Sequence, residues 1–293
     1  MKFRTGEEAR PCKLQTGNGE TGIALALGGG FSRGFAHLGV LEVLEQEHIP
    51  VAAIAGTSIG GLLGAGYADG ISVAELCELG RKVRVRDFIR FHRQDQDGPK
   101  TDRIARFVRE WFRSSQVEEL PIPTAIVTTD LSTCAPYVFT RGSLEVAIRA
   151  TCAFPGLFNP VEHEGRMLAD GCIVSPVPTA TAARMNAGCV LGVAVGSYVT
   201  ASAGRQVVQI FNEAKRLRGS LTEPWWTRQA DFLLAPEVHH IDWNDFSRVD
   251  EARAAGADAM RRALPDVRKL LERTSQICAK ADSSGHAESR VAI

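Results

Sequence analysis

The chain has no apolar run long enough to cross a membrane and no secretory signal. Its uninterrupted apolar segments fall far short of the ~20 residues that a membrane-spanning helix needs. The N-terminal stretch "MKFRTGEEARPCKLQTGNGETG" lacks the apolar core of a signal peptide. We therefore expect residues 1–21 to form a polar, flexible leader and the protein to reside in the cytoplasm.

The chain also lacks an excess of charge and a cysteine motif. Lys and Arg together number 34, as do Asp and Glu, so the formal net charge is zero and no nucleic-acid partner is indicated. The seven cysteines are scattered, without the C-x-x-C spacing of a zinc knuckle. An odd number of cysteines without a signal peptide is typical of free thiols in a reducing compartment. We expect no metal site.

The apolar runs that are present predict an α/β fold. Two of them, "IALAL" at 23–27 and "VAAIA" at 51–55, have the pattern of buried strands, and each is followed by a turn and an apolar helical segment. This alternation is typical of a mainly parallel sheet with covering helices. Further strands are predicted at 124–131, 189–196 and 230–238, and a closing amphipathic helix at 246–275. Because no linker divides the chain, we expect one domain over residues 22–275 and a disordered polar tail over residues 276–293.

The stretch "GTSIG" places Ser58 between a predicted strand and a predicted helix. A sharp strand-to-helix turn exposes a serine as a nucleophile, and the flanking Gly56 and Gly60 remove side chains that would collide. The N–H group of Ile59, at the start of the helix, would face the same place. The alternative is a tight turn with no chemistry.

A second glycine-rich turn, "GGGFSRG" at 28–34, follows the first predicted strand. It is not a dinucleotide fingerprint, because Arg33 stands where the third glycine belongs, and it lacks the G-K-[S/T] of a phosphate-binding loop. We interpret it as a bed of backbone N–H groups for an oxyanion. Arg33 then orients the loop or holds a phosphate head group, and Gly34 ends it.

A serine nucleophile needs a base, and several candidates are open. Asp170, followed by Gly171 in "LADGCIVSPVP", could act directly on Ser58 or could be a turn former. A triad would instead use His239 or His240, although neither stands in a motif. Asp130 is a weaker candidate because it fits a turn after a strand.

Four ordered stretches together resemble the patatin-like phospholipase family, particularly its bacterial members. They are "GGGFSRG", "GTSIG", "RATCAFPGLFNPV" at 149–161 and "DGCIVSPVP" at 170–178. The resemblance spans about residues 22–275. It implies a three-layer sandwich, hydrolysis of acyl esters in lipids through an acyl-serine, and no cofactor. It also implies that Ser58 is the nucleophile, that Asp170 is the base, and that Gly29, Gly30 and Phe31 lie on the oxyanion loop.

Two departures from that family bear on the rate. Phe31 stands where many relatives have glycine, and since a β-carbon resists positive φ, we expect an ordinary backbone conformation there. Cys172 stands where many relatives have a second glycine after the aspartate. These departures argue for the alternative that the chain is a non-catalytic lipid-binding or regulatory protein with the same fold, whereas the intact Ser58 and Asp170 argue against it.

Other features leave a peripheral membrane contact open. A basic stretch at 81–113 could contact anionic lipid or could be a solvated surface. Trp225 and Trp226 fit a membrane interface, a lid or a contact between subunits. A helical stripe (Ile104, Phe107, Val108, Trp111 and Phe112) predicts core packing. The oligomeric state is not predicted.

Overall fold

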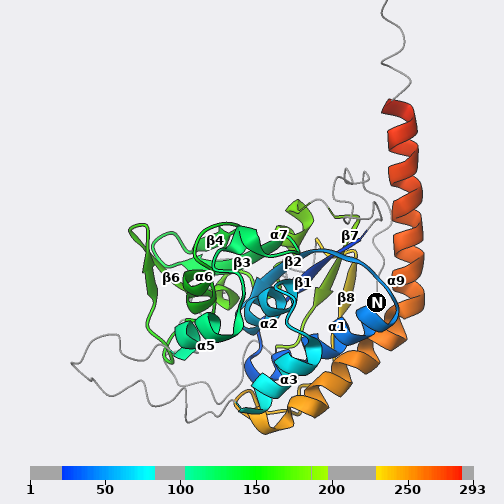
Figure 1. The fold of residues 1–293 in the computed structure, drawn as a ribbon. Coiled ribbons are helices and arrows are strands. Elements are labelled where there is room, and N and C mark those ends of the chain that lie inside the picture. The colour runs from blue at the N-terminus through cyan, green and yellow to red at the C-terminus, as the bar shows by residue number, and fades with distance from the viewer. Residues whose placement is uncertain (1–21, 83–102, 186, 197–228, 286–293) are drawn as a thin grey trace, which may run out of the picture.

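The computed structural model describes residues 22–82, 103–185, 187–196 and 229–285, which form a twisted sheet between layers of helices (Figure 1). The strands of the sheet are β1 (Ile23–Leu27), β2 (Val51–Thr57), β3 (Thr124–Asp130), β4 (Ala135–Phe139), β5 (Val161–His163), β6 (Arg166–Asp170), β7 (Cys189–Val193) and β8 (Phe232–Leu234). The helices are α1 (Ala36–Gln46), α2 (Ile59–Ala68), α3 (Val73–Lys82), α5 (Arg103–Trp111), α6 (Leu144–Thr151), α7 (Thr179–Arg184) and α9 (Val249–Gly285).

The sheet is mainly parallel, as the sequence predicted. Its strand order is β5-β6-β3-β2-β1-β7-β8, with β4 paired to β3. The segment from β3 through β2, β1 and β7 to β8 is parallel, whereas β4, β5 and β6 form the antiparallel part. The carboxyl ends of β1, β2 and β3 therefore meet at one edge, where the turns that follow these strands can form a site.

The two faces of the sheet differ in side-chain size. In β1, Ile23, Leu25 and Leu27 belong to a core of large aliphatic residues, while Ala24 and Ala26 belong to a second, alanine-rich core. This alternation follows from the two-residue period of a strand. Residues of α1, α2, α3 and α9 pack in the first core, and α7 covers the alanine-rich face (Figure 1). The structure thus confirms the three-layer arrangement.

The long α9 helix packs against α1 with almost no side chain between the two backbones. A β-carbon on Gly39 would overlap the Arg253 carbonyl, and one on Gly256 would overlap the Ala36 carbonyl. No helix in the described ranges combines the length and apolar character needed to cross a bilayer.

The helix α9 continues to Gly285, so the expectation of a disordered tail from residue 276 was wrong for residues 276–285. That expectation rested on polar composition. However, residues 266–284 contain neither proline nor glycine, and a polar sequence without these breakers continues a helix that is already nucleated.

Candidate active site

Ser58 occupies a strained turn between β2 and α2. Its backbone has φ 54° and ψ −126°, a region that residues with a β-carbon rarely adopt. A β-carbon on Gly56 would overlap Gly61, and one on Gly60 would overlap the Leu27 carbonyl oxygen. Only glycine lets the strand and the helix approach this closely, so the two motif glycines have a steric reason to be there.

Thr151, at the end of α6, connects this turn to the sheet. The backbone N–H of Ser58 donates to Thr151 Oγ1 at 2.8 Å, and the Thr151 hydroxyl donates to the Val127 carbonyl at 2.6 Å. Thr151 is completely buried. Thr151 lies within the stretch 149–161, but no sequence pattern indicates its role, because its partners lie 24 and 93 positions away in the chain.

Asp170, the last residue of β6, faces Ser58 directly. The Ser58 hydroxyl donates to Asp170 Oδ2 at 2.6 Å, and the Cys172 N–H donates to Asp170 Oδ1 at 2.8 Å. The Asp170 backbone is held on both sides, since its N–H donates to the Ala153 carbonyl and its carbonyl accepts from Thr129 Oγ1. Both carboxylate oxygens therefore have a fixed donor.

Burial raises the pKa of Asp170 from 3.8 to about 6, because the carboxyl group is cut off from water. The hydrogen bonds from Ser58 and Cys172 act in the opposite direction and limit the increase. At neutral pH the group is mostly ionised, and it is a stronger base than an exposed aspartate. Burial and the neighbouring Asp170 raise the pKa of the Cys172 thiol, so the thiol stays protonated.

The glycine-rich turn lies beside Ser58, but its N–H groups do not all face the same way. The Gly28 N–H donates to the Val193 carbonyl, and the Gly29 N–H donates to the Pro176 carbonyl at 3.0 Å. The expected oxyanion role of Gly29 therefore conflicts with its hydrogen bond. Within the described residues, the N–H groups of Gly30, Phe31 and Ile59 have no acceptor.

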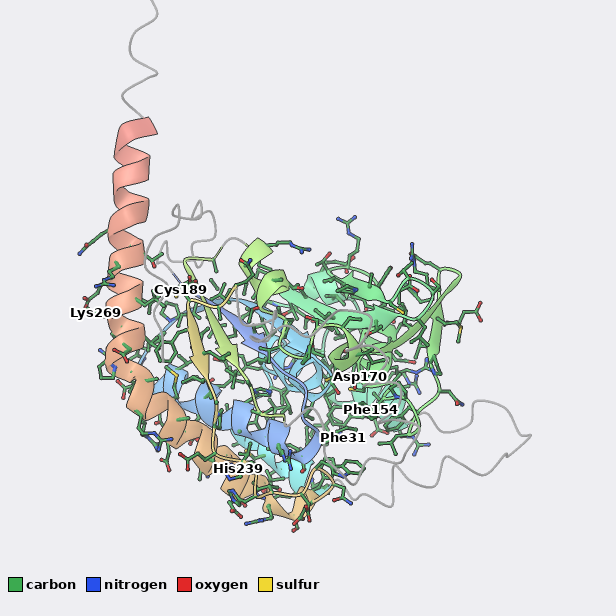
Figure 2. All side chains as sticks on the ribbon, turned by 180° about the vertical axis from the view of Figure 1, so that it is seen from behind. Phe31, Phe154, Asp170, Cys189, His239 and Lys269 are labelled. Carbon is green, nitrogen blue, oxygen red and sulfur yellow. The ribbon has the colours of Figure 1, made fainter. Side chains whose placement is uncertain are left out.

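Phe31 has φ 51°, so the expectation of an ordinary backbone conformation was wrong. Its ring lies edge-on to Phe154 and Trp243, with ring centroids at 5.1 and 5.0 Å (Figure 2 labels Phe31 and Phe154). Each aromatic pair is worth about 0.5–1.5 kcal/mol. The two pairs together therefore offset the ~1–2 kcal/mol by which a left-handed backbone conformation destabilises a residue with a β-carbon.

The rest of the turn is docked on the distant segment 239–243. Arg33 is buried, and its guanidinium donates to the Ile241 and His239 carbonyls at 2.7 and 3.3 Å. The Ser32 N–H and hydroxyl donate to the carbonyls of Trp243 and Asp242. Arg33 does not line the cavity described below, and its guanidinium is bonded to backbone carbonyls instead.

His37 lies beneath the same turn, although no sequence motif indicates a role for it. It is fully buried, its Nε2 lies 2.7 Å from the Gly28 carbonyl, and its Nδ1 has no partner. Burial lowers the pKa of His37 to about 4, so the ring is neutral at physiological pH. The Gly28 carbonyl can only accept, so Nε2 carries the proton and anchors the loop.

The remaining glycines and Cys172 fill the space around the two reacting groups. A β-carbon on Gly34 would overlap the Ile59 side chain, and one on Gly171 would overlap the Val127 carbonyl. A β-carbon on Gly29 would overlap the Cys172 sulfur, so the Cys172 side chain packs directly under the glycine-rich turn.

The alternative bases have other partners. His240 Nε2 lies 2.7 Å from Glu251 Oε1, and both His239 and His240 are exposed outside the cavity. Asp130 accepts from Ser132 and forms an ion pair with Arg166 at 2.6 Å; these bonds hold its pKa well below the usual range of an aspartate. A group with so low a pKa is a poor base.

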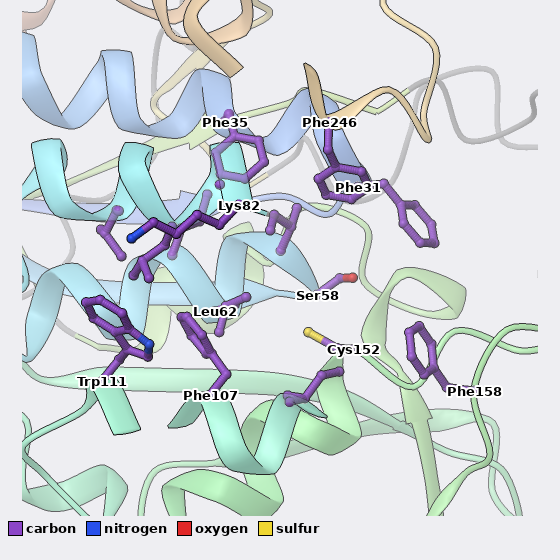
Figure 3. A pocket seen from close by; sticks show the side chains of 16 residues that line it. Phe31, Phe35, Ser58, Leu62, Lys82, Phe107, Trp111, Cys152, Phe158 and Phe246 are labelled. Atoms are coloured by element: carbon purple, nitrogen blue, oxygen red, sulfur yellow. The ribbon is translucent and has the colours of Figure 1, made fainter. Parts of the chain in front are cut away.

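An apolar cavity of about 330 Å³ opens beside Ser58 (Figure 3). Its wall includes Leu62 and Leu63 of α2, Leu76 and Leu79 of α3, and Ile104, Phe107 and Trp111 of α5. The core packing predicted for the α5 stripe is confirmed for the buried Val108 and for Ile104, Phe107 and Phe112, which pack against the core, but it was wrong for Trp111, which is 41% exposed. Ile104, Phe107 and Trp111 also line this cavity. In Figure 3, Ser58 lies at one side of the cavity, and Lys82 and Trp111 lie at the other.

Two of the sequence features fall partly or wholly outside the described residues. Residues 83–102 of the basic stretch and Trp225-Trp226 lie outside the described residues. Within the described part of the stretch, Arg81 forms ion pairs with Asp250 and Glu78, and Arg109 pairs with Glu145.

The model of the family "Patatin-like phospholipase" matches residues 25–183, more than half of the chain. The chain belongs to the patatin-like phospholipase family. This matched region contains Ser58, Asp170 and the glycine-rich turn, whereas segment 239–243 lies beyond it.

Several proteins are similar to this patatin-like chain. An uncharacterized NTE family protein of Mycobacterium tuberculosis is 35% identical over 61% of this chain and 50% of its own length. Human patatin-like phospholipase domain-containing protein 6 is 33% identical over 66% of this chain and 14% of its own length. The chain thus spans half or less of these relatives. Among solved structures, VipD from Legionella pneumophila has a TM-score of 0.49 at 12% identity, covering 94% of this chain and 72% of VipD.

Proposed function

We propose that the chain is a serine lipid acyl hydrolase, which cleaves carboxylic esters of the phospholipid or lysophospholipid type with a dyad of Ser58 and Asp170. The observation that carries this proposal is the 2.6 Å hydrogen bond from the Ser58 hydroxyl to a buried carboxylate, beside an apolar cavity. The family supports lipid substrates in general.

In the first half of the reaction, Ser58 Oγ attacks the ester carbonyl and its proton passes to Asp170 Oδ2. The carbonyl oxygen then carries negative charge, which the N–H groups of Gly30, Phe31 and Ile59 stabilise. Each such donor is worth about 3 kcal/mol in comparable sites. Protonated Asp170 returns the proton to the departing alcohol oxygen, and the acyl group remains on Ser58.

In the second half, Asp170 takes a proton from a water molecule that attacks the acyl-serine. The same N–H groups stabilise the second oxyanion, and the proton returns to Ser58 Oγ as the acid leaves. A base works best when its pKa lies near the working pH, which the pKa of about 6 satisfies. No step requires an imidazole, a metal ion or an organic cofactor.

The other predicted site residues support these groups in this proposal. Gly56 and Gly60 allow the strained turn that exposes Ser58, and Gly171 lets Asp170 approach β3. Arg33 orients the oxyanion loop through the 239–241 carbonyls, with Gly34 leaving room for Ile59.

The test is to react the full chain with a lipid-like fluorophosphonate and to map the adduct by mass spectrometry. We expect one adduct on Ser58 that disappears in Ser58→Ala and in Asp170→Asn, together with loss of ester turnover by at least 10³-fold, the size of a lost reacting group. The double variant His239→Ala/His240→Ala is the matched control and should keep both the Ser58 adduct and ester turnover. Full activity in Asp170→Asn would refute the assignment of Asp170 as the base. A folded protein that binds lipid vesicles but forms no adduct would instead favour a non-catalytic lipid-binding role.

A further inference from the structure

The wall of the cavity beside Ser58 includes an exposed lysine. Sixteen described residues line this cavity, and Lys82, the last residue of α3, is the one charged residue among them. Its Nζ lies 5.8 Å from the centre of the Trp111 ring. Figure 3 shows both residues at the side of the cavity away from Ser58. A ligand that enters beside Ser58 and follows the apolar wall therefore meets a cation at its far end.

This cation has no acidic partner in the part of the chain that the structure describes. The neighbouring cations do: Arg81 is held by Asp250 and Glu78, and Arg109 is held by Glu145. Aromatic rings attract a cation only weakly at an exposed site. Lys82 is thus positioned by Trp111 while its charge remains available to a ligand.

The helix α5 gives a length scale for that ligand. On α5 the lining residues run from Ile104 to Trp111, which corresponds to about 10 Å at the rise of an α-helix. An extended chain of single bonds advances about 1.2 Å per bond, by the dimensions of an extended backbone, so about eight bonds fit. The volume of about 330 Å³ lies at the small end of ligand cavities, which suits one acyl chain and not two.

We propose that the cavity binds a single acyl chain of about eight carbons whose far end carries an anionic group, such as the free carboxylate of a dicarboxylic acid half-ester, and that Lys82 determines this specificity. This inference rests on the proposed function, because it takes Ser58 as the point where the ester carbonyl binds. A terminal methyl group would displace water from the ammonium without replacing its interactions, whereas a carboxylate forms an ion pair there.

The binding test uses full-length Ser58→Ala protein and two methyl esters of equal length, methyl octanoate and monomethyl octanedioate, measured by calorimetry. The esters differ only at the far end. We expect the octanedioate ester to bind about fivefold tighter, the size of an exposed ion pair, and the preference to shrink in high salt. Adding Lys82→Met should abolish the preference and Lys82→Arg should keep it. Lys269→Met removes the same charge from the exposed surface of α9 and should change nothing (Figure 2).

The turnover test uses the same two esters with the wild-type serine, so that failure of this inference and failure of the proposed function look different. Equal binding of the two esters, or a preference that survives Lys82→Met in folded protein, overturns the specificity proposal even if both esters are hydrolysed. Selective binding without hydrolysis of either ester overturns the proposed function and leaves the carboxylate site standing.

Discussion

Replacing Asp170 with Asn should stabilise the protein at neutral pH while it abolishes activity. The substitution keeps the shape of the side chain and removes a charge that is fully buried. The Asn oxygen can still accept from the Cys172 N–H, and its amide can donate to Ser58 Oγ, so neither position loses its partner. The variant therefore isolates the free energy of keeping a carboxylate away from water.

The magnitude follows from the pKa of Asp170, which folding raises from 3.8 to about 6. The folded state thus binds the proton more tightly than the unfolded chain does. Stability from this group is fully present below pH ~4 and is lost as the pH rises through about 6. A difference of about two in pKa corresponds to about 3 kcal/mol. At pH 8 the Asn variant should therefore unfold roughly 5 °C higher than the wild type.

The assay is thermal and urea unfolding of both proteins at pH values from 4 to 8. All other titrating groups are shared, so they cancel in the difference between the two proteins. That difference should grow from pH 4 to about pH 6 and then level off. An Asn variant that is less stable at pH 8, or a difference that does not change with pH, would refute the reasoning.

Three further predictions concern the same site. The kcat/KM of ester hydrolysis should rise with pH through an apparent pKa of about 6 and level off above it, because ionised Asp170 is the base; a profile that falls in this range would contradict the assignment. Thr151→Val leaves the Ser58 N–H buried without its acceptor and removes the hydroxyl's bond to the Val127 carbonyl, so urea unfolding should show a loss of about 1–3 kcal/mol that Thr151→Ser does not. Phe31→Gly should be about 1 kcal/mol more stable than Phe31→Ala in the same assay, because both lose the ring contacts and only Ala keeps the backbone strain; equal stabilities would show that Phe31 is unstrained.

The sequence predicted those parts of the site that depend on local pattern. Apolar runs located β1, β2 and the turn after each, and the glycines around Ser58 indicated a sharp turn between a strand and a helix. The positive φ of Phe31 could not be predicted this way, because the rings that hold it come from positions 154 and 243.

The direction of individual N–H groups was also beyond local reasoning. The Gly29 N–H donates to the Pro176 carbonyl, which lies in a different motif. The glycine-rich turn therefore has fewer N–H groups without an acceptor than its sequence indicates. Thr151 and His37 are ordinary residues in helical patterns, and only their burial against the two turns gives them a role. Long-range contacts of this kind leave no periodic signal in a single sequence.

The docking of Ser32 and Arg33 on segment 239–243 has a consequence for evolution and for protein engineering. Every acceptor in that segment is a backbone carbonyl, a group that all twenty amino acids carry. Apart from Trp243, whose ring packs on Phe31, the side chains of this segment can therefore change without removing a hydrogen bond from the turn beside Ser58, so these four hydrogen bonds place little constraint on its sequence. A fragment cut at residue 183, where the family match ends, would hold every proposed reacting group but lose this support, together with β7 and β8.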